Sequence, residues 1–586
     1  MAQPLNVKDD TTARHPRAFE PVTRVVTAVL STLGKRPVKH PGTDRLPTRR
    51  ATAGPGKAAP LLALTIVSAV ALSACAGGQV RTPASNSAAG NSTFVYATNN
   101  NVVTDWDPGT SYSNEIIAME NIYESLTFYD PATKKVSPRL ATAWTSSADG
   151  KTWTFTLPGN AKFHSGRALD ATAAKESIER TIKLDGGPAY IWASVSTITA
   201  ASPTSLVFNL KYPAPLDLIA SSDYGAYIYD VNAAGTTDLK SWLGKGHDAG
   251  SGPYTVDAWQ QGQATELRLK AVPDYWASWK GQHYQNIEFR VSPQVTTSWQ
   301  LLQRGEVSFL NKVNPQIFEQ AQTTSGVHAS STSSFQNDLA MFNTASGPMA
   351  DIRVRKAVQA AIDTDGLLAA LKGDGVAASQ LIPAGLLGYT PDLQLRQNLE
   401  TAKSLLSEAG YGPGGKQLTL NLTYAQGDSD QQLFVTLLTS ALNQLGVKLN
   451  AQPMQWNAQS AQARSTNLDS RQDILVFRWY PDYADPYTWF LNLFHSSQQP
   501  HFNVTYLDDK SVDATIDSIP QLTATSRDQA QSAYATLQAT LVQDKAVVAP
   551  LWVTKYERVY ASSVGGYVDN PAYPDVVFVH DLTPGS

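Results

Sequence analysis

The chain has 586 residues and only one cysteine, Cys75. A lone cysteine excludes disulfide bonds within the chain, CxxC redox chemistry and zinc sites built from cysteine. HExxH and GxSxG, the patterns of zinc and serine hydrolases, are also missing, and the nine histidines are not grouped at metal-ligand spacing. We therefore expect no metal, no cofactor and no catalytic residue.

Basic charge is scarce beyond the first 57 residues. That segment holds eleven Lys/Arg and four Asp/Glu, a net charge of +7, and the whole chain has −4, so residues 58–586 carry −4 − 7 = −11. No basic stripe is visible in this acidic part, so the composition gives it no electrostatic reason to bind nucleic acid. The basic segment contains many Pro and Thr residues, and we expect it to be disordered.

Long apolar runs are absent apart from one, Leu61–Leu72. This run has about half of the roughly 20 residues that a membrane-spanning helix needs. A short apolar run that follows basic residues and precedes small ones is typical of a secretion signal. Here the run continues into Ser73-Ala74-Cys75, and the whole segment resembles a bacterial lipoprotein signal peptide.

The lipoprotein resemblance implies that Cys75 carries a diacylglycerol thioether and becomes the first residue after cleavage. The protein would then be extracytoplasmic and anchored by lipid to the outer face of the cell membrane. The alternative is a buried cysteine in a core helix. We expect residues 1–75 to be a basic extension and signal peptide, and residues 76–92, rich in Gly, Ser, Ala and Asn, to be a flexible linker.

Apolar patterns of helical and strand period alternate after the linker. About 510 residues follow Cys75, which predicts two or three domains. The alternation predicts α/β domains. Helices are expected over residues 171–183, 354–371, 399–409, 432–445, 487–494 and 527–545, and strands from residue 93 and over 152–157, 206–210, 267–270, 287–291, 418–424, 447–451 and 473–479. Asp149-Gly150 predicts a hairpin turn, because Gly adopts positive φ without a steric cost.

Several sequence blocks occur in a fixed order over about 450 residues. The first are Tyr123-Glu124-Ser125-Leu126, Pro138-Arg139-Leu140-Ala141-Thr142-Ala143-Trp144, Asp149-Gly150-Lys151-Thr152-Trp153-Thr154-Phe155-Thr156-Leu157 and Lys162-Phe163-His164-Ser165-Gly166. Others lie at residues 250–254, 273–276, 304–307, 342–357 and 549–551. Together they resemble the family 5 extracellular solute-binding proteins, the oligopeptide, dipeptide and nickel group that serves ABC importers. Pro158, where the family usually has a basic residue, and Ser308, where it has an acid, depart from the pattern.

The family resemblance implies an α/β, two-lobed periplasmic-binding-protein-like fold of type II, with an extra domain inserted in the first lobe. Lobe I would comprise residues 93–118, 249–341 and 547–586, the additional domain 119–248, and lobe II 342–546. Ligand binding would close the lobes by a hinge. The protein would be a monomer that docks on the transmembrane subunits of an ABC permease.

The block from Arg478 to Pro486 is the one that bears most directly on ligand binding. In peptide-binding members, a W-x-x-D element lies in the cleft, and here it places Trp479, Tyr480 and Asp482 in a ligand site. The resemblance implies that the backbone beside Trp479 pairs with the peptide main chain and that Asp482 takes the α-ammonium. Both roles are physically reasonable, because peptides of different sequence share only a backbone and charged ends. The alternative for Asp482 is a helix cap, although Asp485 fits that role better.

The expected function is the capture of short peptides in a cleft between the lobes, without catalysis. An oligosaccharide, a metal chelate or an opine-like solute remains open as the ligand. A rival from another class is a secreted glycosidase that uses two carboxylates and an aromatic platform. A third hypothesis is a surface sensor with the same fold. The 13 Trp and 24 Tyr residues are compatible with an organic ligand, although for any single aromatic residue we favour a place in the core, because large domains need large core residues.

Overall fold

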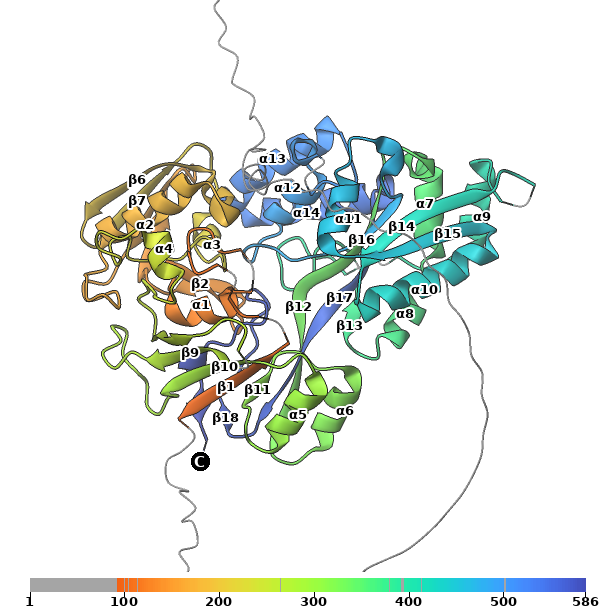
Figure 1. The fold of residues 1–586 in the computed structure, drawn as a ribbon. Coiled ribbons are helices and arrows are strands. Elements are labelled where there is room, and N and C mark those ends of the chain that lie inside the picture. Colours follow the sequence, from red (N-terminus) through yellow and green to blue (C-terminus); the bar gives the residue numbers. More distant parts are fainter. Residues whose placement is uncertain are drawn as a thin grey trace, which may run out of the picture. The chain divides into compact units, whose positions relative to one another are not determined.

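One mixed sheet of eleven strands organises the chain (Figure 1). The structure is a computed structural model that describes residues 92–585 except 100, 104, 113, 264, 379, 392–394, 413, 500 and 501. The predicted lipidation site Cys75 and the predicted basic segment lie outside the described residues, as does all but the last residue of the predicted linker. The described residues belong to one compact unit, Ser85–Ser586.

The strand order divides the sheet into two groups joined by two long strands. In order, the strands are β15 (Val447–Met454), β14 (Leu418–Ala425), β16 (Ile474–Trp479), β12 (Val327–Phe342), β17 (Val548–Ala561), β11 (Phe309–Leu310), β1 (Thr93–Thr98), β10 (Asn286–Val291), β9 (Thr265–Ala271) and β8 (Tyr254–Trp259), with β13 (Gly375–Ala377) on β17. The long antiparallel strands β12 and β17 lie side by side between the two groups (Figure 1). Their ladder shifts register between Ser333 and Asn337, and again between Asp338 and Leu339.

Strand β14 and helix α10 (Ser429–Gln444) show why the group at β14–β16 folds as predicted. The leucines at 418, 420 and 422 alternate along β14 and are buried against Phe434 and Leu438 of α10. Asp428 caps the helix by accepting from the backbone N–H groups of Asp430 and Gln431. Gly446, at φ +75°, follows the helix and leads into β15.

The elements between β1 and β8 form sheets of their own. Strands β4 (Ala143–Ser146), β5 (Thr152–Thr156), β7 (Ser205–Leu210) and β6 (Val195–Ser202) make a four-stranded sheet beside α2 (Ala171–Leu184), and β2 (Thr127–Asp130) pairs with β3 (Lys135–Pro138). The predicted hairpin turn is confirmed, because β4 and β5 pair across it and Gly150 has φ +66°.

The remaining α-helices and strands of the described residues lie around these sheets. They are α1 (Ile116–Ile122), α3 (Leu216–Ile219), α4 (Leu239–Leu243), α5 (Val295–Gln303), α6 (Pro315–Thr323), α7 (Ile352–Ala361), α8 (Thr364–Ala370), α9 (Leu399–Glu408), α11 (Trp456–Ala463), α12 (Tyr487–Phe494), α13 (Lys510–Thr525), α14 (Arg527–Ala539), β18 (Val564–Gly565) and β19 (Thr583–Pro584).

Two predicted helices differ from the structure. The helix expected over 354–371 is two helices, α7 and α8, because Ile362 is extended and the Asp363 carboxylate accepts from the Gly366 N–H to start a new helix. The helix expected over 527–545 ends its α-helical part at Ala539 and continues as a π-turn, Thr540–Asp544. The other predicted helices and strands are confirmed, within a few residues at their ends.

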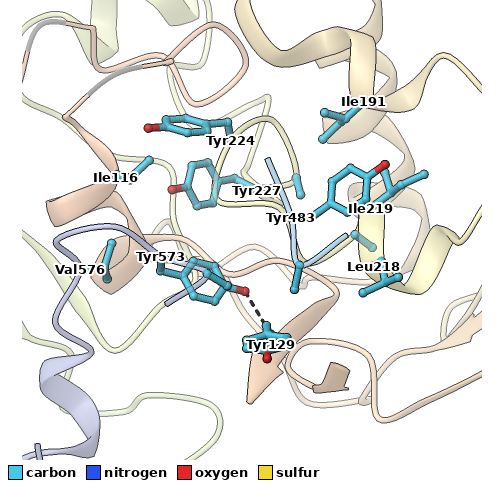
Figure 2. Close-up of a cluster of buried hydrophobic side chains, with 14 of the residues drawn as sticks. Ile116, Tyr129, Ile191, Leu218, Ile219, Tyr224, Tyr227, Tyr483, Tyr573 and Val576 are labelled. Atoms are coloured by element: carbon cyan, nitrogen blue, oxygen red, sulfur yellow. Dashed lines mark hydrogen bonds between the residues drawn. The ribbon is translucent and has the colours of Figure 1, made fainter. Parts of the chain in front are cut away.

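The largest core cluster joins distant parts of the chain (Figure 2). Tyr227 and Tyr483 are buried in it together with Ile219, and the Tyr573 hydroxyl accepts a 3.2 Å hydrogen bond from the backbone N–H of Tyr129. Burying a large aromatic side chain contributes roughly 1.5–3 kcal/mol. This core therefore fixes the C-terminal segment and the 219–227 segment against the residues just before α12.

Candidate functional site

A cavity of about 330 Å³ lies beside the end of strand β16. The three residues predicted to bind a ligand, Trp479, Tyr480 and Asp482, all line it. Asp428 and Gln431, at the start of α10, line it as well. The cavity therefore lies beyond the carboxyl end of the parallel strand β14, where ligands bind in open α/β sheets.

The backbone of β16 is only partly paired where it borders this cavity. On one side, β16 pairs with β12 along its whole length, from Ile474 to Trp479. On the other side, its ladder with β14 covers only Ile474 and Leu475. The next carbonyl, that of Val476, accepts from Gln459 Nε2 at 3.4 Å. The stretch from Phe477 to Trp479 thus offers a strand edge to the cavity.

Asp482 is a buried carboxylate surrounded by hydroxyl groups. Its side chain accepts hydrogen bonds from the hydroxyls of Tyr112, at 3.2 Å, and Tyr190, at 2.5 Å. Its backbone carbonyl accepts from Ser222 Oγ at 2.7 Å. Burial raises the pKa of Asp482, and the hydrogen bonds from Tyr190, Thr488 and Tyr112 oppose that rise.

The helix-cap alternative does not account for the Asp482 carboxylate. Asp485 Oδ1 accepts from the Tyr487 N–H at 2.8 Å, at the first residue of α12. Asp485 therefore takes the role at the helix start that the sequence favoured for it. The Asp482 side chain contacts the Thr488 hydroxyl of α12 and, in addition, two tyrosines that precede it by 292 and 370 positions.

Three tyrosines from the first part of the chain meet the 479–482 segment, and sequence reasoning missed all of them. Tyr112 and Tyr190 contact Asp482, and the Tyr224 and Tyr480 hydroxyls are 3.0 Å apart. The Tyr112 and Tyr224 rings pack edge to face at 4.9 Å. The only signal in the sequence is the general abundance of tyrosine, which does not single out these three.

Arg478 supplies positive charge to the cavity wall, and two acids already hold it. Its Nε is 3.0 Å from Asp338 Oδ2, and its Nη2 is 3.1 Å from Asp428 Oδ2. Asp338 raises the pKa of Arg478 further above its usual range, whereas burial raises the pKa of Asp338 itself. Arg478 is therefore a fixed, compensated charge, in contrast to Asp482.

Trp479 belongs to a group of aromatic rings on the cavity wall. Its ring centroid is 5.3 Å from that of Phe477 and 5.1 Å from that of Phe502. Trp456 stacks on Phe477 at 5.3 Å with an interplanar angle of 26°. Among the described residues, the buried Trp479 Nε1 has no hydrogen-bond acceptor.

A second cavity, of about 580 Å³, lies at the carboxyl ends of β1, β10 and β11. Ser429 and Asp430 line it, immediately after Asp428, which lines the smaller cavity. The larger cavity lacks all three residues predicted from the sequence. We place the candidate site in the smaller one, because it combines the open strand edge, the aromatic rings and a carboxylate with only neutral partners.

The described residues include no helix with the length and apolarity needed to cross a membrane.

Comparison with known proteins assigns a family to this arrangement. Residues 135–501 match the bacterial extracellular solute-binding proteins, family 5 (middle). The chain is 25% identical over 461 residues to the probable D,D-dipeptide-binding periplasmic protein DdpA of Escherichia coli, covering 78% of this chain and 86% of that protein.

Solved structures show the same fold. The oligopeptide-binding protein AppA of Bacillus subtilis, in complex with a nonapeptide, superposes with a TM-score of 0.68 at 20% identity, covering 84% of this chain and 99% of that one. NikA of Brucella suis, in complex with Fe(III)-EDTA, gives a TM-score of 0.72 at 20% identity, with the same two coverages. These likenesses confirm the α/β, two-lobed periplasmic-binding-protein-like fold.

Proposed function

The chain belongs to family 5 of the bacterial extracellular solute-binding proteins, and we propose that it captures short peptides and delivers them to the permease of an ABC importer. The observation that carries the choice of ligand is the pairing of an open strand edge at Phe477–Trp479 with the Asp482 carboxylate in one cavity. An extended peptide can add to the strand edge through its main chain, which gives affinity independent of its side chains. Its α-ammonium can then donate to Asp482.

The contacts of Asp482 leave capacity for such a ligand. An ionised carboxylate has about four acceptor positions; the two tyrosine hydroxyls occupy one on each oxygen and the Thr488 hydroxyl takes another, which leaves room for one further donor. Those hydroxyls are neutral, so the charge of Asp482 has no cationic partner among the groups that hydrogen-bond to it. A peptide ammonium would supply that charge, and charge-assisted hydrogen bonds are roughly twice as strong as neutral ones.

The lobe limits expected from the sequence are part of this proposal: residues 93–118, 249–341 and 547–586 for lobe I, 119–248 for the additional domain and 342–546 for lobe II. Support comes from β12 and β17, which connect the two strand groups and whose ladder is irregular at Ser333–Asn337. An irregular ladder is a place where two strands can bend. Tyr112 and Tyr190 already contact Asp482 in this structure, so opening of the lobes at this hinge would separate the two tyrosines from Asp482. The proposed binding role involves no catalysis.

Attachment by lipid at Cys75, on the outer face of the cell membrane, also belongs to the proposal. The support is the sequence pattern around Cys75 and the family, whose members are extracellular. Delivery as a monomer to permease subunits follows from the same family membership.

Titration calorimetry on four combinations tests the ligand assignment: wild type and Asp482→Ala, each with a free dipeptide and its N-acetylated form. Removing one partner of a buried charge pair costs roughly 2–5 kcal/mol, so Asp482→Ala should weaken binding by a factor of roughly 30 to several thousand. Asp482→Asn keeps the shape of the side chain and should lose nearly as much. Acetylation of the dipeptide should weaken its binding to wild type by about the same factor as Asp482→Ala does. In the Asp482→Ala variant, acetylation should cause almost no further loss of affinity.

Independent losses from acetylation and mutation would show that Asp482 does not hold the ammonium. If neither change matters, the ligand is not a peptide held in this way, and a neutral sugar becomes the better hypothesis. Asp428→Asn is a useful control, because Asp428 lines the same cavity but already pairs with Arg478.

A further inference from the structure

Four aromatic side chains form a continuous row along one wall of the candidate cavity. Neighbouring ring centroids are separated by 5.3 Å from Trp456 to Phe477, 5.3 Å from Phe477 to Trp479 and 5.1 Å from Trp479 to Phe502. All four residues line the cavity that Asp482 also lines. They come from three separate places in the chain: the start of α11, strand β16 and the segment after α12.

The row is incompletely covered by the protein. Trp456 is 45% exposed, although it is one of the largest apolar side chains, and Trp479 and Phe502 are partly exposed. Phe477 and Trp479 lie two residues apart on β16, so their rings project from the same face of the strand. Aromatic surface that faces a cavity with a few fixed polar groups is typical of a site for an organic ligand.

A polar group at the same wall is also available to a ligand. The indole N–H of Trp479 is buried and has no acceptor among the described residues, although buried indole N–H groups usually find a partner. A ligand carbonyl beside Trp479 would satisfy it. The unsatisfied donor and the uncovered rings thus belong to the same residue row.

The size of the cavity limits how much ligand it holds. Its volume of about 330 Å³ is at the low end of the roughly 300–1,000 Å³ of ligand pockets. A ligand whose ammonium is at Asp482 and whose first side chain stays in this cavity therefore lies beside the aromatic row.

We propose that the row of Trp456, Phe477, Trp479 and Phe502 is a side-chain subsite that selects short peptides with an aromatic or large apolar side chain. The inference rests on the proposed function, because it assumes that a peptide ammonium binds Asp482. The selected side chain is that of the first residue, next to the ammonium. It stacks on the partly exposed rings and removes their surface from water.

The test compares dipeptides that differ only in the first side chain, using calorimetry on the full chain. Phe-Ala, Trp-Ala and Leu-Ala should bind roughly 10- to 100-fold more tightly than Gly-Ala, a factor of ten being about 1.4 kcal/mol. Trp456→Ala should reduce this preference several-fold, because it weakens Phe-Ala and Trp-Ala binding much more than Gly-Ala binding. Trp456→Phe should keep most of it, because a ring remains stacked on Phe477.

Leu468→Ala is the matched control, since Leu468 is also an exposed large apolar residue, at 46%, but does not line the cavity. Leu468→Ala should change neither the affinity for Phe-Ala nor the affinity for Gly-Ala. Thermal melting of each unliganded variant shows whether the fold is intact, and Trp456 is exposed enough for its removal to be tolerated.

The possible failures are distinguishable. If Phe-Ala and Gly-Ala bind equally well to wild type, or if Trp456→Ala weakens both equally, the selective subsite is refuted while peptide binding stands. If Lys-Ala or Asp-Ala binds more tightly than Phe-Ala, the row does not set the preference, and the inference is again wrong. If no dipeptide binds but a sugar or a metal chelate does, the proposed function and this inference fall together.

Discussion

Glu120, at the centre of helix α1, makes a sharp prediction about the pH dependence of stability. Its side chain is buried, and Tyr227 donates a 3.2 Å hydrogen bond to its Oε1. Burial raises the pKa of Glu120 from 4.5 to about 8, while the charge of Arg139 and the hydrogen bond from Tyr227 oppose the rise. The neighbouring Asp223 is also buried, and its pKa is raised too, first by burial and then by the charge of Glu120.

The sign of the effect follows from proton linkage. Because the folded-state pKa of Glu120 lies above its unfolded value, the folded protein binds this proton more tightly. The stability that Glu120 contributes is fully present below about pH 4.5 and is lost as the pH rises to about 8. Each pH unit within that window removes up to about 1.4 kcal/mol, so the change from pH 5 to pH 8 is on the order of 4 kcal/mol.

Urea denaturation of wild type and Glu120→Gln at pH 5, 6.5 and 8 measures the pH-dependent contribution of Glu120 to the free energy of unfolding. Gln keeps the shape and can still accept from Tyr227, but it cannot ionise. The variant should therefore gain stability over wild type as the pH rises, and the gain at pH 8 is a large part of a total stability of roughly 5–15 kcal/mol. Glu179→Gln, an exposed change on α2, should give curves parallel to wild type. Equal pH dependence in wild type and Glu120→Gln would refute the reasoning.

Two further predictions concern the anchor and the core. Cys75→Ala should move the protein from the membrane pellet to the soluble fraction on cell fractionation, because it removes the expected lipid; a mature variant that stays in the pellet contradicts the lipoprotein hypothesis. Gly250→Ala should destabilise the fold by roughly 1–3 kcal/mol in urea denaturation, because its Cβ would overlap the backbone carbonyl of Ile122. The matched change Gly159→Ala, at a site with no atom within 4 Å, should have little effect, and equal losses would show that overlap is not the cause.

Most of the secondary structure could be predicted from the sequence because its determinants are local. Leu418–Ala425 alternates in step with the strand, and Gly410 and Gly446 end helices at positive φ. The break inside 354–371 could not be predicted from periodicity, because apolar residues continue across it with a helical pattern. The break depends on the Asp363 carboxylate, which competes with the helix for the Gly366 N–H.

The residues of the candidate site also fall into those that a local motif predicts and those that only tertiary contacts bring in. Trp479, Tyr480 and Asp482 are close in the sequence, so a single motif pointed to all of them. Tyr112 and Tyr190 act through contacts that span hundreds of residues, and no local pattern marks them. The aromatic row was missed for a related reason, since Trp456 and Phe502 join it only through tertiary packing.

The tyrosine contacts to Asp482 have a consequence for selectivity. Burial raises the pKa of Asp482 and so favours its protonated, neutral form, and Tyr190, Thr488 and Tyr112 oppose this only with neutral hydroxyls. A cationic ligand shifts the balance to the carboxylate and gains the full charge-assisted bond, whereas a neutral ligand of the same shape does not. The hydroxyls of Tyr112 and Tyr190 come from a part of the chain far from Asp482 in sequence. The environment that favours binding of a cation at Asp482 therefore exists only when these segments lie together. Under the proposed function, selection of the charged end of a ligand therefore requires that these segments have come together.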